Sequence, residues 1–187
     1  AASVHHQADP ASAKRPDCLS CHGALHAMAP VADEASLVHP KRLAATCGKC
    51  HADPELGAQA GVKLVQPLAA YEASVHAGGV ARGEHAATCS DCHGSHGILP
   101  AENAQSQVNR KNVPATCAAC HAEVSKAYGE SVHGVAAAAG IGESPVCTDC
   151  HGEHRILGPG DKGSPVYASN VPKMTCGRCH GDLRVTE

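Results

Sequence analysis

Twelve cysteines and fifteen histidines carry the chemistry of this 187-residue chain. All twelve cysteines fall into six Cys-x-x-Cys pairs, and a histidine directly follows each pair. The six motifs are Cys18/Cys21/His22, Cys47/Cys50/His51, Cys89/Cys92/His93, Cys117/Cys120/His121, Cys147/Cys150/His151 and Cys176/Cys179/His180. Positions i, i+3 and i+4 share one face of a helical turn, so two thiols can bond the vinyl groups of a haem while the imidazole reaches its iron. The pattern is the attachment signature of c-type haem.

Other uses of paired cysteines explain the pattern less well. Zinc ribbons, redox dithiols and disulfide frameworks all employ Cys-x-x-Cys, but none of them requires a histidine after the second cysteine. No cysteine is left over after the six motifs are assigned. The sequence therefore predicts six covalently attached c-type haems.

Composition points to an unusual core. The chain has no Phe, no Trp and only three Tyr, so the large side chains that normally fill a domain of this length are missing. Six haems in 187 residues leave about 31 residues for each. We expect the porphyrins to form the core, wrapped by a mostly coil chain with short α-helices and little or no β-structure. The formal charge of −3 and the scattered basic residues argue against nucleic-acid binding, and no apolar run is long enough for a transmembrane segment.

An internal repeat organises the chain. The repeated unit contains a Ser-Val-His element, a first Cys-x-x-Cys-His motif and a second such motif that is preceded by Thr. The copy that begins at Ser74 recurs from Ser131 at an offset of 57 to 59 residues, and a more diverged copy begins at Ser3. We call the three predicted two-haem units module 1 (1–51), module 2 (71–121) and module 3 (128–180). Residues 52–70 and 122–127 are the predicted connections, and 181–187 form a tail.

Local signals place the expected elements. Pro67 is expected to start a helix that runs to His76, and a second helix is expected over 122–133. Residues 97–114 and 155–174 are rich in Pro, Gly, Asn and Ser and are predicted to be loops. A glycine follows the first motif of every module and is expected to close its helix in a left-handed conformation.

Six of the nine histidines outside the motifs recur at matched positions. They are the Ser-Val-His residues His5, His76 and His133, and the residues shortly after each first motif, His26, His96 and His154. Six recurrent histidines for six irons predict bis-histidine ligation throughout. His5 is preferred over the adjacent His6 because it follows Ser-Val. His39 aligns with Asn109 and His85 has no counterpart, so neither is expected to be a ligand.

The spacing also suggests which iron each of these histidines serves. His96 lies three residues after His93 and cannot reach the opposite face of the same haem, so it must serve a neighbour. The simplest choice lies within the module: His26, His96 and His154 would serve the second motif, and the Ser-Val-His residues the first.

With these motifs in place, the chain resembles the multihaem c-type cytochromes that carry doubled Cys-x-x-Cys-His motifs. The resemblance extends over nearly all of residues 3–180. Members of this broad group include periplasmic electron shuttles, subunits of membrane quinol-oxidising complexes and extracellular cytochrome filaments. It implies haem attachment outside the cytoplasm, hence a periplasmic or extracellular location, and the Ala-Ala-Ser start fits the end left by removal of a signal peptide.

The expected function is electron transfer along closely spaced haems, with redox proteins as donors and acceptors. A membrane quinol-oxidising complex or an extracellular acceptor is a candidate partner. Bis-histidine ligation leaves no open iron position, so the chain is not expected to be an enzyme; the alternative is a multihaem reductase of nitrite, sulfite, tetrathionate or hydroxylamine. A further alternative is a homopolymeric filament subunit, in which the His5/His6 arm either ligates a haem of the next subunit or folds on its own module.

Overall fold

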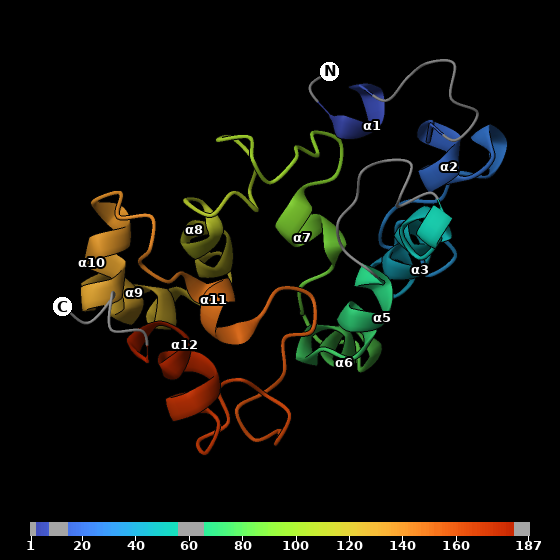
Figure 1. Ribbon diagram of the computed structural model, residues 1–187. Coiled ribbons are helices and arrows are strands. Elements are labelled where there is room, and N and C mark those ends of the chain that lie inside the picture. Colours follow the sequence, from blue (N-terminus) through green and yellow to red (C-terminus); the bar gives the residue numbers. More distant parts are fainter. Residues whose placement is uncertain (1–2, 8–14, 56–65, 182–187) are drawn as a thin grey trace.

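The computed structural model describes residues 3–7, 15–55 and 66–181, and within these ranges the chain forms short helices and coil without any strand (Figure 1). The helices are α1 (Val4–Gln7), α2 (Cys18–His22), η1 (Leu25–Ala27), α3 (Pro40–His51), α5 (Pro67–Glu72), α6 (Val75–Ala81), α7 (Cys89–His93), α8 (Val113–Ala118), α9 (Ala122–Glu130), α10 (Val132–Ala138), α11 (Cys147–His151), η2 (Val171–Cys176) and α12 (Gly177–His180). The predicted helix-and-coil class is confirmed. Residues 56–65 of the predicted 52–70 connection, and 182–187 of the tail, lie outside the described residues.

The short helices run from α2 on one side of the molecule to α10 on the other, and α11 and α12 then turn back toward the middle (Figure 1). Helix α2 lies at one end and α10 at the other, with α7 between them. The three helices that carry the first motif of each module, α2, α7 and α11, succeed each other in this direction. Among the described residues, no helix has both the length and the apolar character needed to cross a membrane.

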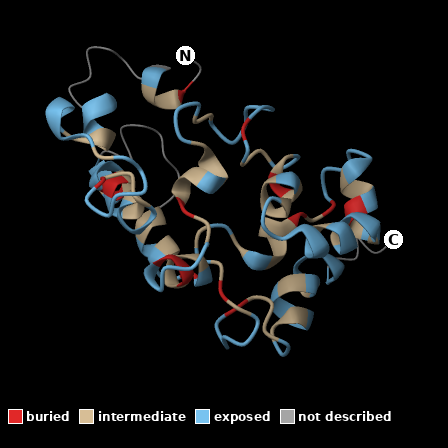
Figure 2. Cartoon of the chain, turned by 180° about the vertical axis from the view of Figure 1, so that it is seen from behind, coloured by how far each residue is buried: buried red, intermediate tan, exposed pale blue. Residues whose placement is uncertain are grey.

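Side chains contribute little to the interior. The apolar residues that are buried among those described are Val80, Val113, Val146 and Leu157. Most of the described chain is half-buried or exposed, and the few buried positions are scattered along it (Figure 2). The low content of large apolar residues thus gives a structure without a side-chain core of ordinary size, as the composition predicts.

A loop with the same hydrogen bonds follows the first motif in all three modules. A serine hydroxyl donates to the carbonyl seven residues earlier at 3.2 Å in the pairs Ser36–Ala29, Ser106–Leu99 and Ser164–Leu157. A threonine hydroxyl then donates at 2.7 Å in the pairs Thr46–Leu37, Thr116–Gln107 and Thr175–Pro165. These bonds make Met28 equivalent to Ile98 and Ile156, and they align His26 with His96 and His154.

The helices expected over 67–76 and 122–133 are each broken in two. Helix α5 ends at Glu72 and α6 begins at Val75, because the hydroxyl of Ser74 accepts a hydrogen bond from the Ala77 amide at 3.1 Å and caps a new helix. Ser131 caps α10 in the same way, at 3.2 Å from the Gly134 amide. His76 and His133 therefore lie in the first turn of a helix, where the sequence pattern predicts its end.

The glycine after each first motif has the expected positive φ, which is 82° at Gly23, 77° at Gly94 and 80° at Gly152. Their ψ angles of −167°, 176° and −177° differ from those of a left-handed helical cap. This combination is available essentially only to glycine, and it leads the chain out in an extended direction toward His26, His96 and His154.

Candidate functional site

The helix of each first motif is fixed at its start by a side chain three positions further on. The side chains of Ser20, Asp91 and Asp149 accept from the amide of the capping residue, at 3.1, 2.7 and 2.7 Å. This arrangement satisfies an otherwise unpaired amide and holds the five-residue turn in register. The two cysteines and the histidine of each first motif are therefore presented on one short helix.

Ten of the twelve predicted histidine ligands come together in five pairs of rings. Ring centroids lie 6.1 Å apart for His5–His51, 6.0 Å for His22–His96, 6.2 Å for His76–His121, 5.9 Å for His93–His154 and 6.0 Å for His133–His180. Every pair joins one motif histidine to one histidine outside the motifs. The separation varies by only a few tenths of an ångström, although the residues come from different parts of the chain.

This separation fits two imidazoles bound to one iron. An imidazole nitrogen binds a metal at about 2 Å and lies about 1 Å from its ring centre, so two rings on opposite sides of an iron have centroids about 6 Å apart. The cysteines of each motif lie on the same short segment as one ring of the pair, as covalent attachment of that haem requires. The residues present thus suit bis-histidine c-type haem.

The expected assignment of the recurrent histidines to motifs is wrong for both positions. The Ser-Val-His residues face the second motif of their own module, and the histidines after a first motif face the first motif of the preceding module. The physical reason is a bond between modules. The Val4 amide donates to the Ile98 carbonyl at 2.8 Å, and the Val75 amide donates to Ile156 at 2.9 Å. These bonds seat the start of the first two Ser-Val-His helices on the segment that follows the next module's first motif.

Two predicted ligands lack such a partner. Among the described residues, no ring contact joins His26 or His151 to another histidine. His26 lies in η1, just after α2, and His151 ends α11. Five motif histidines thus face a second histidine in the part of the chain that the structure describes, and His151 does not.

The three histidines that were not expected to be ligands have other positions. The His39 ring nitrogen Nδ1 accepts from the Lys41 amide at 3.3 Å and caps α3, just as Asn109 Oδ1 accepts from the Lys111 amide at 3.2 Å. His6 lies 2.6 Å from the guanidinium of Arg15, whereas its neighbour His5 faces His51. His85 is exposed.

Burial favours the neutral, metal-binding form of several paired rings. It is the main cause that lowers the pKa of His5, His76 and His93, and the charge of the facing ring lowers each of them further. Neutral imidazole is the form that binds metals. These rings are thus ready to act as ligands near neutral pH.

The cysteines of successive motifs lie close together in sequence order. Cys47 and Cys89 are within hydrogen-bonding distance, and so are Cys117 and Cys147; this hydrogen bond lowers the pKa of Cys89 and of Cys147 to about 7. Electrostatic interactions connect the remaining neighbours, Cys21 with Cys50, Cys92 with Cys120, and Cys150 with Cys176. The six motifs therefore form one continuous series.

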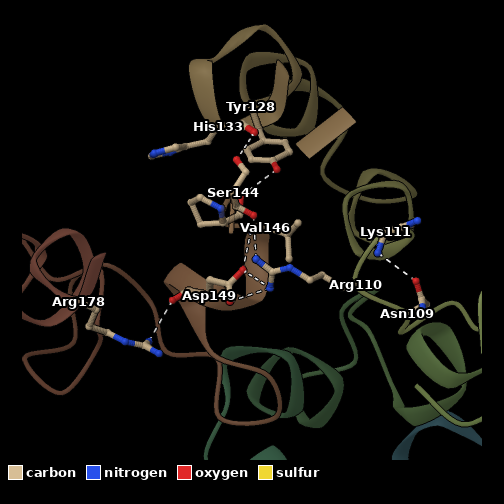
Figure 3. A network of polar contacts seen from close by, with 10 residues as sticks. Asn109, Arg110, Lys111, Tyr128, His133, Ser144, Val146, Asp149 and Arg178 are labelled. Atoms are coloured by element: carbon tan, nitrogen blue, oxygen red, sulfur yellow. Dashed lines mark hydrogen bonds and ion pairs between the residues drawn. The ribbon is translucent and has the colours of Figure 1, made fainter. Parts of the chain in front are cut away.

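Sequence reasoning missed the polar contacts that hold the motif helices in place. Figure 3 shows Arg110 of module 2 reaching Asp149 of α11, with Nη1 2.7 Å from Oδ2, while Nη2 donates to the Ser144 carbonyl at 2.8 Å. The Ser144 hydroxyl donates to the His133 carbonyl at 2.7 Å, and the His133 ring points away from this network. One network therefore connects α11 to module 2 and to the ligand helix α10.

Two tyrosines form matching clamps. The Tyr71 hydroxyl donates to the Ala87 carbonyl at 3.0 Å, and the Tyr128 hydroxyl donates to Pro145 at 2.9 Å. Each acceptor lies two residues before the first cysteine of a motif. The signal was present in the sequence, because the two tyrosines recur at the repeat offset of 57 residues.

A family model described as the doubled CXXCH motif matches residues 78–126, which include the motifs at His93 and His121. Searches of curated proteins and of solved structures found no match. The doubled motif indicates a multihaem c-type cytochrome, which binds haem covalently and transfers electrons.

Proposed function

We propose that the chain carries six covalently attached c-type haems and conducts electrons along its length, as a carrier and not as an enzyme. The observation that carries the proposal is the set of five histidine pairs, each with one motif ring and one other ring about 6 Å apart. Bound haem supplies one-electron iron chemistry. The protein would supply the cysteines that attach each haem, a facing pair of imidazoles at five of the six motifs, and the spacing between neighbours.

The order of the motifs supports conduction. Cysteines of motifs two and three, and of motifs four and five, share a hydrogen bond, and the other neighbours in the series interact electrostatically, so the attached haems would lie in a row. Arg110 and the two tyrosine clamps hold the motif helices of modules 2 and 3 in place. An electron entering at one end of the molecule has a continuous series of sites toward the other.

The setting of this function follows from the cofactor. Haem attachment of this type takes place in an exported compartment, so we place the protein in the periplasm or outside the cell. Donors and acceptors are redox proteins, with a membrane quinol-oxidising complex or an extracellular acceptor as the candidates. If copies of the chain form a polymer, the same function becomes long-range electron transfer from copy to copy.

Denaturing mass spectrometry tests the haem number. Because the thioether bonds survive denaturation, the purified protein should have the mass of the chain plus six haems. Replacing both Cys147 and Cys150 by Ser should remove one haem and leave five. A fully matured protein with fewer than six haems would contradict the proposal.

Electron paramagnetic resonance tests the carrier role against the reductase alternative. Irons with two histidine ligands are low-spin and closed, whereas a reductase keeps an open iron for its substrate. His85 is exposed and has no matched position in another module, so His85→Ala should have the same spectrum as the wild-type protein and serves as the control. Turnover of nitrite or hydroxylamine at an open iron that persists in concentrated, assembled protein would overturn the carrier assignment.

A further inference from the structure

The unpaired residues His26 and His151 are the two halves of one kind of contact. Twice in the structure, a first-motif histidine faces the histidine that follows the next module's first motif, in His22–His96 and His93–His154. Both pairs have nearly parallel rings, at 13°. In this series His151 lacks the partner that a following module would supply, and His26 lacks the partner that a preceding module would supply. One chain therefore carries both complementary halves.

A backbone bond accompanies this contact each time. The valine amide of the Ser-Val-His element donates to the residue two positions after the facing histidine, Val4 to Ile98 and Val75 to Ile156. The equivalent donor in module 3 is Val132, and the equivalent acceptor in module 1 is the Met28 carbonyl. No bond is recorded from the Val132 amide among the described residues.

The segments around both of these halves carry exposed large apolar residues. Val132 is 80% exposed, whereas its counterpart Val75 is 46% exposed, and Met28 is 43% exposed. Exposed large apolar residues gather on the segments around each half, with Leu19, Leu25, Met28 and Val31 beside His26, and Val132, Val135 and Ile141 on and after α10. Such patches mark interaction sites. The two segments lie at opposite ends of the molecule (Figure 1), so they cannot cover each other within one chain.

We propose that His26 of one copy is the second axial ligand of the haem attached at His151 of another copy, so that copies join head to tail. The proposal rests on the haem-carrier function above. Module 3 of one copy would then contact module 1 of another copy in the same way that module 1 contacts module 2, and module 2 contacts module 3, within one chain. A surface that binds a different surface of an identical copy forms a heterologous interface, which gives a ring or an open filament. The row of motifs then continues from one chain to the next.

This arrangement assigns the bridging role to residues other than the N-terminal arm. His5 faces His51 within its own chain, and His6 contacts Arg15. The arm thus lies on module 1, the alternative that matches the other modules, and the joint between copies lies at His26.

The test compares His26→Ala with His154→Ala in the full-length protein loaded with haem. Each variant removes a histidine from the same structural position, but the partner of His154 lies in the same chain. Light scattering after size exclusion, electron microscopy and electron paramagnetic resonance are the readouts. Wild-type protein should form multimers with all irons low-spin. His26→Ala should be monomeric with one high-spin iron per chain, whereas His154→Ala should gain one high-spin iron and remain multimeric.

Added His26→Ala protein gives a second readout. It keeps the haem at His151 but has no ligand to offer, so small amounts mixed with dissociated wild-type chains should shorten the multimers. Wild-type protein that stays monomeric with one open iron, or a His26→Ala variant that assembles normally, would overturn the proposal. Either result would leave the carrier function standing if six haems are bound. A chain with fewer haems would instead refute the carrier function itself.

A variant away from the ligands tests the interface. Val132→Pro removes the amide expected to donate to Met28 of the next copy, and proline is tolerated because Val132 is the first residue of α10 and Ser131 before it is extended. Loss of one net hydrogen bond should weaken association by about fivefold. The haem count and the spin state of the other five irons should stay unchanged. Association as tight as that of the wild type would show that modules in different chains do not meet in this way.

Discussion

The rings of His93 and His154 lie parallel within 13°, with centroids 5.9 Å apart, although the two residues belong to different modules. His96, which is much nearer to His93 in sequence, faces His22 instead. These two ring pairs therefore connect each module to the next one. In the proposed haem-loaded protein, iron sites shared between modules would add order to a chain with a small side-chain core.

This cross-module pairing predicts which iron loses a ligand. His154→Ala should convert one iron to the high-spin state, and because His154 faces His93 we expect it to be the iron of the haem attached through Cys89 and Cys92. Adding Cys89→Ser and Cys92→Ser to this variant should abolish the high-spin signal, whereas adding Cys176→Ser and Cys179→Ser should leave it. Electron paramagnetic resonance of the three proteins checks this. The opposite result would restore pairing within the module.

The contact between Arg110 and Asp149 should stabilise the joint between modules 2 and 3. Arg110→Lys keeps the charge but loses the fork that reaches both Asp149 and the Ser144 carbonyl, so the free energy of unfolding should fall by about 1 kcal/mol. Arg82→Lys is the matched control, because Arg82 pairs only with the nearby, more exposed Glu84. Denaturant unfolding of the haem-loaded proteins measures both. Equal effects would show that the joint does not depend on this contact.

Tyr71 should make stability fall at high pH. Burial is the main cause that raises the pKa of its phenol to about 12, above the ordinary value of about 10. A group that holds its proton more tightly when folded stabilises the protein below its unfolded pKa, and this contribution is lost as the pH rises from about 10 to about 12. In Tyr71→Phe, the loss of stability over this range should be smaller. Denaturation midpoints measured against pH check this, with Tyr167→Phe as the control.

Charge should govern the choice of soluble redox partners. The formal charge of −3 becomes more negative when haem propionates are added, so partners should dock through basic patches and react more slowly as salt rises. Stopped-flow electron exchange with a basic and an acidic small cytochrome, over a range of ionic strength, measures this. Faster reaction with the acidic cytochrome at low salt would show that net charge does not set the docking face.

The sequence by itself determined the chemistry. Six Cys-x-x-Cys-His motifs specify the cofactor because two thiols and an imidazole must lie on one turn of helix, and this requirement is local. The absence of Phe and Trp predicted a chain without an ordinary core, and the recurrence of His76 and His133 marked them as candidate ligands. All of these features depend on residue types and short spacings.

Only the tertiary structure decided which histidines meet. Closeness in sequence favoured pairing His96 with the second motif of its own module, but the bond from Val4 to Ile98 brings His96 to His22 of the preceding module. Such a contact depends on how a connection folds back in space, which local spacing does not encode. The same holds for His26 and His151, which look equivalent to the other ligands in sequence. They differ because no histidine ring faces either of them in the described part of the chain, and the joint that we propose between copies uses these two residues.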